Sequence, residues 1–328
     1  MITASRPDKP ALAACGLADI RQALRTTGLW LDYGAASMHL RSDSRALARQ
    51  VQAVYRHFPF ENNGPWADLH VQIRRPATLR RWLAPQVVFR CDGSQPFDPF
   101  PADSPLPLLE WGGNWLIGQR LNDLLLLHAG AVERDGLALL LPALPGSGKS
   151  TLTAALSLRG WRLLSDEFGA YDPALGVLRA MLKPIALKNE SIAVIRAFAP
   201  QALLGPEFPK TRKGTVAHLS AAADSVARRR EPALPGAVIL PKWVAGSPTR
   251  LAPLALDRLF PSLAFNAFNY TTLGATGFDA AVRLTRECLA WTLVYSELTG
   301  ALEAIDAVWP QVLRRQAAGR AGSVEAPP

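Results

Sequence analysis

The chain has 328 residues, 49% hydrophobic and 19% charged, a composition typical of a folded globular protein rather than a disordered one. The apolar runs are too short to cross a bilayer, the N-terminus lacks the apolar segment of a signal peptide, and three scattered cysteines exclude a disulfide framework or a zinc site. The net charge of +9 fits anionic substrates, and no aromatic interleaving or reading helix accompanies the dense basic run Arg228–Arg230. We therefore expect a cytoplasmic protein with neither a membrane nor a nucleic-acid partner.

The first predicted domain covers residues 1–105 and has α+β character. The stretches GLWLDYGAASMHL, ADLHVQIRR and APQVVFRC are typical of strands, and SRALARQVQAVYRHF has the spacing of an amphipathic helix with Ser44 as its N-cap. The proline-rich stretch Cys91–Trp111 predicts a linker after them. We find no catalytic constellation in this domain.

The second predicted domain covers residues 106–315. Two apolar runs, LLLLHAGAV and LALLLPAL, are joined by the polar residues Glu133–Gly136 and predict a β-hairpin. The segment KSTLTAALSL then predicts a helix that ends before Gly160, where glycine is a common helix stop. The next run, WRLLS, predicts a short strand that leads to Asp166 and Glu167.

The C-terminal part of the chain has apolar residues at helical spacing. This spacing predicts two helices over Gly277–Arg315, broken near Gly300 and packed on the sheet. The remaining residues, 316–328, are small and polar and predict a disordered tail.

Residues 143–151 read ALPGSGKST and match the nucleotide-binding pattern G-x-x-x-x-G-K-[ST] everywhere except at its opening glycine, which is Ala143. In this pattern backbone amides near the later glycines and the positive end of the next helix bind phosphate. The lysine would reach the β- and γ-phosphates and the serine hydroxyl would bind Mg²⁺. The alternative is a glycine-serine turn that merely caps a helix. The predicted nucleotide-binding residues are Pro145, Gly146, Ser147, Gly148, Lys149, Ser150 and Thr151.

Two acidic residues, Asp166 and Glu167, follow the second strand of the predicted strand–helix–strand unit. The two strands of such a unit run parallel, so these acids should emerge at the same sheet edge as the glycine-rich loop. A carboxylate there can hold Mg²⁺ or accept the proton of an attacking hydroxyl. The alternative is a pair of exposed acids at a strand end.

His128 lies in the first strand of the predicted hairpin. If the turn centres on Arg134 and Asp135, His128 lies opposite Leu141, close to the glycine-rich loop. It could then steer a proton or bind a phosphate oxygen. The alternative is a hydrogen-bonded core histidine.

Two later polar stretches, LKPIALKN and KTRKGTVAHL, contain cations between apolar runs. Phosphoryl transfer needs cations to offset the charge of the transferred group. The alternative is a set of solvated loop charges. The candidate substrate-binding residues are Lys188, Asn189, Arg212, Lys213 and His218.

The order of H-A-G-A-V, A-L-P-G-S-G-K-S-T and R-G-W-R-L-L-S-D-E resembles HPr kinase/phosphorylase and, more closely, the bacterial HPr-kinase-related kinases of the type A group. Further similar stretches are LKNESIAVIR, TRKGTVAHL and FNAFNYTTLGATGF, so the resemblance spans about Leu108–Leu298. It implies an α/β fold with a P-loop kinase core of the HPr kinase / phosphoenolpyruvate carboxykinase type, with ATP and Mg²⁺ as cofactors.

The same resemblance implies the roles of individual residues. Asp166 matches the catalytic base, Glu167 the second acid, where the family usually has aspartate, and His128 the active-site histidine. Lys149 and Ser150 take the loop roles. From their oxygen donors and positions, the candidate metal ligands are Ser150, Asp166 and Glu167. The E-x-R-G stretch typical of true HPr kinases is absent.

The leading hypothesis is an ATP-dependent kinase that transfers the γ-phosphate to a hydroxyl of a peptide, small protein or small molecule, such as a serine. The second is a nucleotide-regulated binding module or weak ATPase, which would have no need of the base at Asp166. A nucleic-acid ATPase would need basic motor motifs, which we do not find. The acceptor, the nucleotide base, a reverse phosphorylase reaction and the oligomeric state, a homo-oligomer included, stay open.

Overall fold

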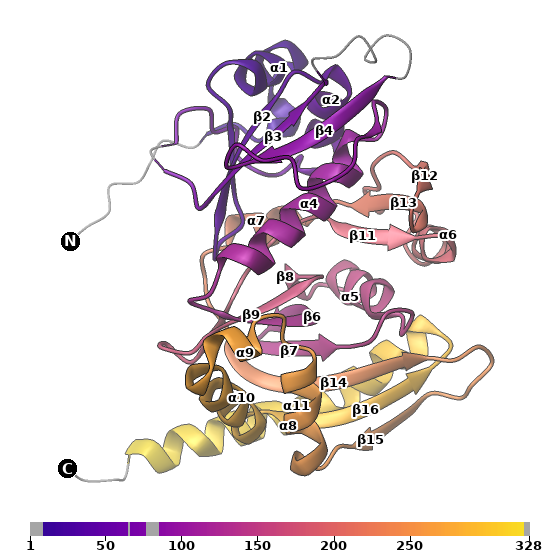
Figure 1. The fold of residues 1–328 in the computed structure, drawn as a ribbon. Helices are drawn as coiled ribbons and strands as arrows, with labels where there is room; N and C mark the ends of the chain where they lie inside the picture. The colour runs from indigo at the N-terminus through magenta and orange to yellow at the C-terminus, as the bar shows by residue number, and fades with distance from the viewer. Residues whose placement is uncertain (1–8, 65, 77–84, 325–328) are drawn as a thin grey trace. The chain divides into compact units, whose positions relative to one another are not determined.

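The computed structural model describes residues 9–64, 66–76 and 85–324 (Figure 1). The fold is mixed α/β and divides into two compact units. Unit 1 contains the chain up to Arg120 together with Leu182–Arg196 and Pro200–Arg229, and unit 2 contains the rest. Compact units need not coincide with functional domains, so the division into residues 1–105 and 106–315 stays a prediction.

Unit 1 is built around a five-stranded sheet of order β1-β2-β3-β4-β5, in which only β2 and β3 pair in parallel. The strand-like stretches and the amphipathic helix predicted here are confirmed, and Ser44 is the N-cap whose Oγ accepts a hydrogen bond from the Leu47 amide at 3.2 Å. The elements are η1 (Leu12–Ala14), α1 (Leu17–Arg25), β1 (Leu29–Asp32), β2 (Ser37–Ser42), α2 (Arg45–Val54), β3 (Leu69–Arg74), β4 (Gln86–Cys91), β5 (Phe100–Pro101) and α4 (Pro105–Arg120).

Helix α4 corrects the predicted linker Cys91–Trp111, because it begins inside that stretch. Pro105 and Pro107 lie in its first turn, where a helix has no carbonyl to accept the missing amide hydrogens, so both are tolerated. Leu108 and Leu109 are buried, which gives the helix its place in the core of unit 1. The linker prediction is therefore wrong from residue 105 onward.

A second, three-stranded antiparallel sheet of order β11-β13-β12 completes unit 1. The Leu182 amide just before it donates a hydrogen bond of 2.9 Å to the carbonyl of Tyr33 in the β1–β2 connection. This bond ties a segment late in the sequence to the first sheet. The segment contains β11 (Ile185–Lys188), α6 (Glu190–Phe198), β12 (Phe208–Thr211), β13 (Gly214–Leu219) and α7 (Ala223–Ala227).

Unit 2 contains an eight-stranded mixed sheet of order β10-β9-β6-β7-β14-β16-β15, with β8 also paired to β6. Helices α5 and α11 pack against the sheet and each other, while α8, α9 and α10 form a separate group (Figure 1). Among the described residues, no helix is both long and apolar enough to span a membrane. The elements are β6 (Leu125–Arg134), β7 (Leu137–Pro142), α5 (Lys149–Leu158), β8 (Arg162–Ser165), β9 (Phe168–Asp172), β10 (Val177–Arg179), β14 (Leu234–Trp243), β15 (Arg250–Pro253), α8 (Leu256–Phe265), α9 (Tyr270–Leu273), α10 (Ala275–Glu287), β16 (Leu289–Tyr295) and α11 (Leu298–Val324).

The predicted hairpin is confirmed as β6–β7, but its turn lies one residue later than expected. Asp135 and Gly136 form the two-residue turn, with φ of +58° and +78°. An Asp-Gly pair suits such a turn because both residues tolerate the left-handed region. Consequently Gly130, and not His128, lies opposite Leu141.

The C-terminal prediction of two helices is wrong in one respect, because strand β16 lies between α10 and α11. Its sequence, LAWTLVY, is a short apolar run, and periodicity alone does not separate a buried strand from a helix. Gly300 lies in the first turn of α11 and does not break it. Helix α11 also continues to Val324, so the expected disorder of residues 316–324 is not seen, and residues 325–328 lie outside the described residues.

Candidate functional site

The glycine-rich loop connects β7 to α5 in unit 2. Gly146 and Gly148 have φ of +86° and +83°, a region that favours glycine. A Cβ on Gly148 would also lie 2.4 Å from the hydroxyl oxygen of Tyr295, whereas one on Gly146 would meet open space. Ala143 has no positive φ, so the backbone tolerates alanine where the nucleotide-binding pattern has its opening glycine.

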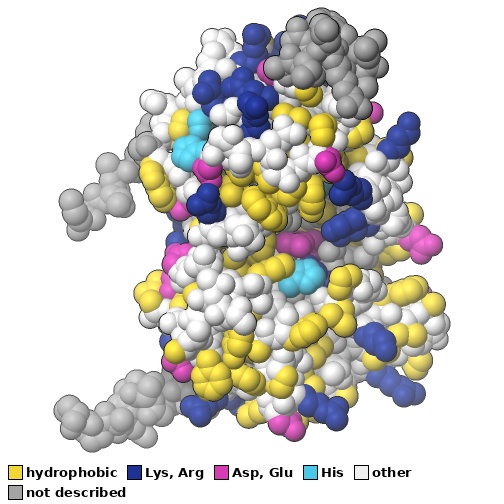
Figure 2. All heavy atoms as spheres, in the orientation of Figure 1, with side chains coloured by type: hydrophobic (Ala, Val, Ile, Leu, Met, Phe, Trp, Pro, Cys, Tyr) yellow, Lys and Arg dark blue, Asp and Glu magenta, His cyan; other side chains and the backbone are white. Residues whose placement is uncertain are grey.

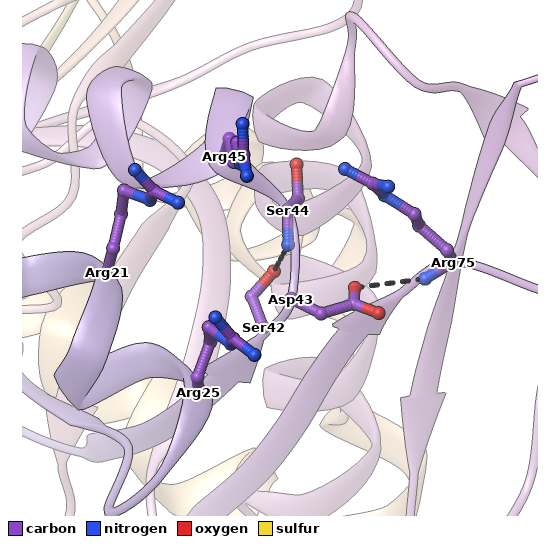
Figure 3. Close-up of a pocket in the computed structure, with 7 residues that line it drawn as sticks. All are labelled: Arg21, Arg25, Ser42, Asp43, Ser44, Arg45 and Arg75. Atoms are coloured by element: carbon purple, nitrogen blue, oxygen red, sulfur yellow. Dashed lines mark hydrogen bonds between the residues drawn. The ribbon is translucent and has the colours of Figure 1, made fainter.

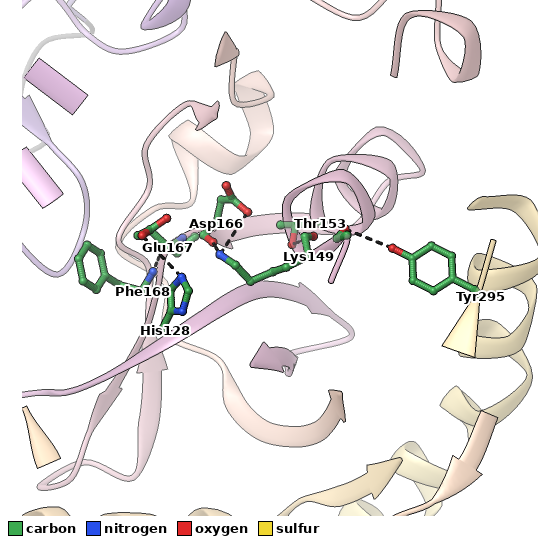
Figure 4. Close-up of polar contacts among 9 residues, drawn as sticks. His128, Lys149, Thr153, Asp166, Glu167, Phe168 and Tyr295 are labelled. Carbon is green, nitrogen blue, oxygen red and sulfur yellow. Dashed lines mark hydrogen bonds and ion pairs between the residues drawn. The ribbon is translucent and has the colours of Figure 1, made fainter. Parts of the chain in front are cut away.

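Two strand ends hold the loop by its carbonyl groups. The Ser147 carbonyl accepts a hydrogen bond of 2.9 Å from the Trp243 amide. The Gly148 carbonyl accepts one of 3.2 Å from the Tyr295 hydroxyl (Figure 4). The carbonyl and amide of one trans peptide point in opposite directions. The amides of Gly148 and Lys149 therefore point away from the side that Trp243 and Tyr295 occupy.

The other side of the loop has the properties of an anion site. The first amides of α5 have no acceptor within the helix, and its N-terminus has the positive end of the dipole. The buried Ser147 Oγ has no hydrogen-bond partner in the described part of the chain. Pro145 and Gly146 are exposed, and Ser150 and Thr151 are half-buried in the first turn. These groups fit a phosphate.

The topology of the sheet brings Asp166 to the same edge as the loop. Strands β7 and β8 both pair antiparallel with β6, on opposite sides of it, so β7 and β8 run parallel to each other. They end at nearly the same level, because Pro142 lies opposite Ala129 and Ser165 lies opposite Ala131. The expected placement of Asp166 at the loop edge is confirmed.

Lys149 and Asp166 meet inside this edge. The Lys149 Nζ donates a hydrogen bond to the backbone carbonyl of Asp166 and lies 3.8 Å from its Oδ1 (Figure 4). Both side chains are nearly buried, at 8% and 7% exposed. A buried charge is stable only when it is paired, so the two groups hold each other in place.

A close contact between β6 and α5 sets the position of the lysine. A Cβ on Gly130 would lie 2.1 Å from the Thr153 Oγ1, so only glycine lets the helix approach this closely. The Thr153 hydroxyl in turn donates a hydrogen bond of 2.9 Å to the Lys149 carbonyl. The end of α5 is also well defined, because Gly160 (φ +92°) and Trp161 donate to the last carbonyls of the helix, which confirms the predicted stop.

His128 lies on the same face of β6 as Gly130, two residues away. Its Nε2 is 3.7 Å from a Glu167 carboxylate oxygen (Figure 4). Its ring packs edge-on against Phe268 at 5.4 Å between centroids. The Glu167 side chain is 36% exposed, in contrast to the nearly buried Asp166. The structure therefore brings the loop, the two acids and the histidine together within unit 2.

The candidate substrate-binding residues lie instead in unit 1, on its three-stranded sheet. Asn189 has φ of +51°, and its side chain accepts from the Thr215 amide at 3.0 Å and donates to the Lys213 carbonyl at 3.3 Å. It therefore pins the β12–β13 turn. The exposed Arg212 forms an ion pair of 3.1 Å with Asp98.

His218 is a core residue of this sheet, and only 1% of it is exposed. Burial lowers the pKa of its imidazole to about 4, with the nearby Lys183 and Lys188 as smaller contributions in the same direction and Glu110 opposing. The ring is thus neutral near pH 7 and faces the interior of unit 1. Lys188 and Lys213, by contrast, are half-buried and exposed.

Sequence reasoning missed Trp243 and Tyr295, which anchor the loop from the ends of β14 and β16. Both belong to apolar strand runs far along the chain, and no local pattern connects them with the loop. No group of three or more His, Cys, Asp or Glu side chains suited to a metal ion occurs among the described residues. No protein-family model matches this chain, and a search of curated proteins found no significant match either.

Proposed function

We propose that this protein is an ATP-dependent kinase that transfers the γ-phosphate to a hydroxyl acceptor. The observation that carries the proposal is the Lys149–Asp166 pair, with 3.8 Å between Nζ and Oδ1, at the edge where a glycine-rich loop meets the start of a helix. A phosphate-binding cation and a carboxylate at one strand edge are the parts that phosphoryl transfer requires.

The residues fit a nucleoside triphosphate on several counts. The amides of Gly148 and Lys149 point away from the anchoring strands, and the Ser147 Oγ lacks a partner among the described residues. Open space over Gly146 leaves room for a phosphate. In this proposal the loop amides hold the phosphate chain, and Lys149 holds the β- and γ-phosphate oxygens.

The oxygen donors also fit a magnesium ion. Ser150 offers a hydroxyl, and Asp166 and Glu167 offer carboxylates, which are the hard ligands that this ion prefers. Mg²⁺ bound with the nucleotide would offset the negative charge of the phosphate oxygens. Fewer than three acidic ligands suffice for such a site, because Mg²⁺ usually keeps several waters.

Asp166 is the proposed base, since it lies at the loop edge where the acceptor hydroxyl must approach the γ-phosphate. It would take the hydroxyl proton as the oxygen attacks the γ-phosphorus, while the bond from this phosphorus to the β–γ bridging oxygen breaks and ADP leaves. His128 and Glu167, 3.7 Å apart, would position the acceptor or the phosphate beside it. The proposed acceptor class is a peptide, small protein or small molecule with a free hydroxyl group.

The test compares the parent with Lys149→Ala in the presence of Mg-ATP. The parent should gain about 2.7 kcal/mol of stability at a hundred times the dissociation constant, and the variant should gain almost none. Lys210→Ala is the matched control, because Lys210 is an exposed lysine of unit 1. Equal stabilisation of parent and Lys149→Ala would contradict the proposal.

Transfer is measured with γ-labelled ATP and a lysate or a serine-peptide library. The proposal predicts labelled acceptor with the parent and with Lys210→Ala but none with Lys149→Ala. Tight ATP binding without labelled acceptor or hydrolysis would favour the nucleotide-regulated binding module instead.

A further inference from the structure

A cavity of about 250 Å³ in unit 1 is lined by four arginines from three separate segments (Figure 3). Arg21 and Arg25 lie one turn apart on α1, Arg45 is the first residue of α2, and Arg75 directly follows β3. In Figure 3 the four side chains surround the space in front of the α2 N-terminus. The rest of the lining is Ser42, Asp43 and Ser44.

The described residues that line this cavity do not balance one another's charge. Four guanidinium groups against one carboxylate leave a formal charge of +3 on the lining. The Oδ1 of Asp43 accepts a hydrogen bond of 3.1 Å from the backbone amide of Arg75. Within the described part of the chain, none of the four guanidinium groups has an ion pair or a hydrogen bond. Four arginines around one space repel each other unless an anion lies between them.

Helix α2, whose N-terminus borders the cavity, has a basic residue where helices usually have acidic ones. Helices favour acidic residues in the first turn, yet α2 has none there and begins with Arg45. Its cap is otherwise complete, because the Ser44 Oγ accepts from Leu47 and the Ser44 amide donates to the Ser42 Oγ at 3.0 Å. The lack of an acidic residue in the first turn of α2 adds to the positive potential that the arginine cluster creates at this helix end.

We propose that this cavity binds a small phosphate-bearing anion, at a site separate from the glycine-rich loop. A planar guanidinium group binds two phosphate oxygens through parallel hydrogen bonds, and the attraction of four such groups grows with the charge of the phosphate. Among the residues that the structure describes, the lining contains no aromatic or aliphatic side chain to hold a nucleoside base. Its volume is also below the roughly 300–1,000 Å³ of drug-sized ligand sites, so the occupant is a phosphate or diphosphate group with little attached to it.

The site is tested by calorimetry with inorganic pyrophosphate and, in a second arm, glycerol phosphate. All variants carry Lys149→Ala, so that the loop does not contribute binding. Removing one charge-assisted contact with Arg45→Ala, or two with Arg21→Ala/Arg25→Ala, should weaken pyrophosphate binding by about 10-fold or more. Arg49→Ala is the matched control, because Arg49 is an exposed arginine one turn along α2 that does not line the cavity. It should change the affinity less than about 2-fold.

The two arms identify the ligand class. Tighter binding of pyrophosphate than of glycerol phosphate supports a diphosphate group, and the reverse order supports a phosphomonoester. Circular dichroism of each variant verifies folding, and Arg75→Ala provides an independent cavity variant if Arg45→Ala does not fold.

The proposal is overturned if Lys149→Ala protein binds neither ligand, or if Arg45→Ala and Arg49→Ala bind equally well. It is also overturned if a short DNA duplex binds more tightly than pyrophosphate and loses that binding in Arg45→Ala, since the cluster would then be a nucleic-acid contact. None of these outcomes depends on kinase activity, so the two proposals stand or fail separately.

Discussion

Two regions of this molecule were predicted from sequence to bind phosphate groups, and the structure places their candidate residues differently. In unit 2 the glycine-rich loop, Asp166, Glu167 and His128 meet at one sheet edge, with 3.8 Å between Lys149 and Asp166. In unit 1 two of the candidate substrate-binding residues have structural roles instead. His218 is buried in the core, and Asn189 supports a turn. The first prediction came from an ordered pattern of elements and the second from residue types alone.

The difference shows why spacing is better evidence than charge. A strand, a loop and a helix in sequence impose a crossover, and the crossover determines where the next strand ends. A histidine or an asparagine between apolar residues does not determine where its side chain will lie in the fold. In this chain such residues became a core imidazole at His218 and a turn support at Asn189.

The largest expected effect is that of Asp166→Asn, and it depends on the proposed kinase function. The amide keeps the shape of the side chain but cannot accept the acceptor proton, so turnover should fall by about 10²–10⁴-fold. Nucleotide affinity measured by calorimetry should fall far less than turnover, because the loop amides and Lys149 still hold the phosphates. Glu167→Gln is the control, because this more exposed acid lies beside His128 and should cost less. Near-parental turnover in Asp166→Asn would end the case for this base.

The next effect concerns the pH dependence of stability through His218. Its pKa in the folded state is lowered from 6.5 to about 4, so the unfolded chain takes up the proton first. The free energy of unfolding should therefore fall as the pH decreases from about 6.5 to 4, by up to roughly 3 kcal/mol from this residue. Urea unfolding of parent and His218→Gln at pH 7 and pH 4.5 measures it, and the variant should lose less stability.

The half-buried His57, whose pKa burial also lowers, provides a control in the variant His57→Gln. It should change the acid sensitivity less than His218→Gln does. Parallel pH curves for parent and His218→Gln would mean that folding does not lower the pKa of the His218 imidazole. That result would return it to the set of substrate-binding candidates.

A smaller effect is expected of Gly130→Ala. The added Cβ would lie 2.1 Å from the Thr153 Oγ1, and overpacking of this kind costs about 1–3 kcal/mol. Displacement of α5 should also weaken nucleotide binding, because Lys149 begins that helix. In a protein that already carries Thr153→Ala, Gly130→Ala should lower the free energy of unfolding much less, because the clashing hydroxyl is gone. Additive losses in the double variant would show that the close approach does not position the helix.

The smallest expected effects on the free energy of unfolding compare Arg212 with Asn189 in unit 1. Arg212→Ala should change the free energy of unfolding by less than about 0.5 kcal/mol, since its ion pair with Asp98 is exposed. Asn189→Ala should cost about 1–2 kcal/mol, because it loses two hydrogen bonds and places alanine at φ +51°. Thermal unfolding measures both, and equal losses would contradict the structural role of Asn189.

The sequence by itself determined the features whose physics is local. Asp135 and Gly136 predict a hairpin because both tolerate left-handed backbone, although the centre of the turn was predicted one residue too early. Gly160 ends α5 for the same conformational reason. The strand–loop–helix–strand order placed Asp166 at the loop edge because the two strands of such a unit run parallel and therefore end at the same edge.

Tertiary structure decided what depends on partners distant in sequence. Strand β16 was predicted as a helix, since its apolar run becomes a strand only by pairing with β14 and β15. No local sequence pattern predicts that Trp243 and Tyr295 anchor the loop. The same holds for the arginines of α1, α2 and the end of β3, which line one cavity. The reason is physical: burial and electrostatic convergence act between surfaces that only the folded chain brings together, whereas turn and cap preferences act within a few residues.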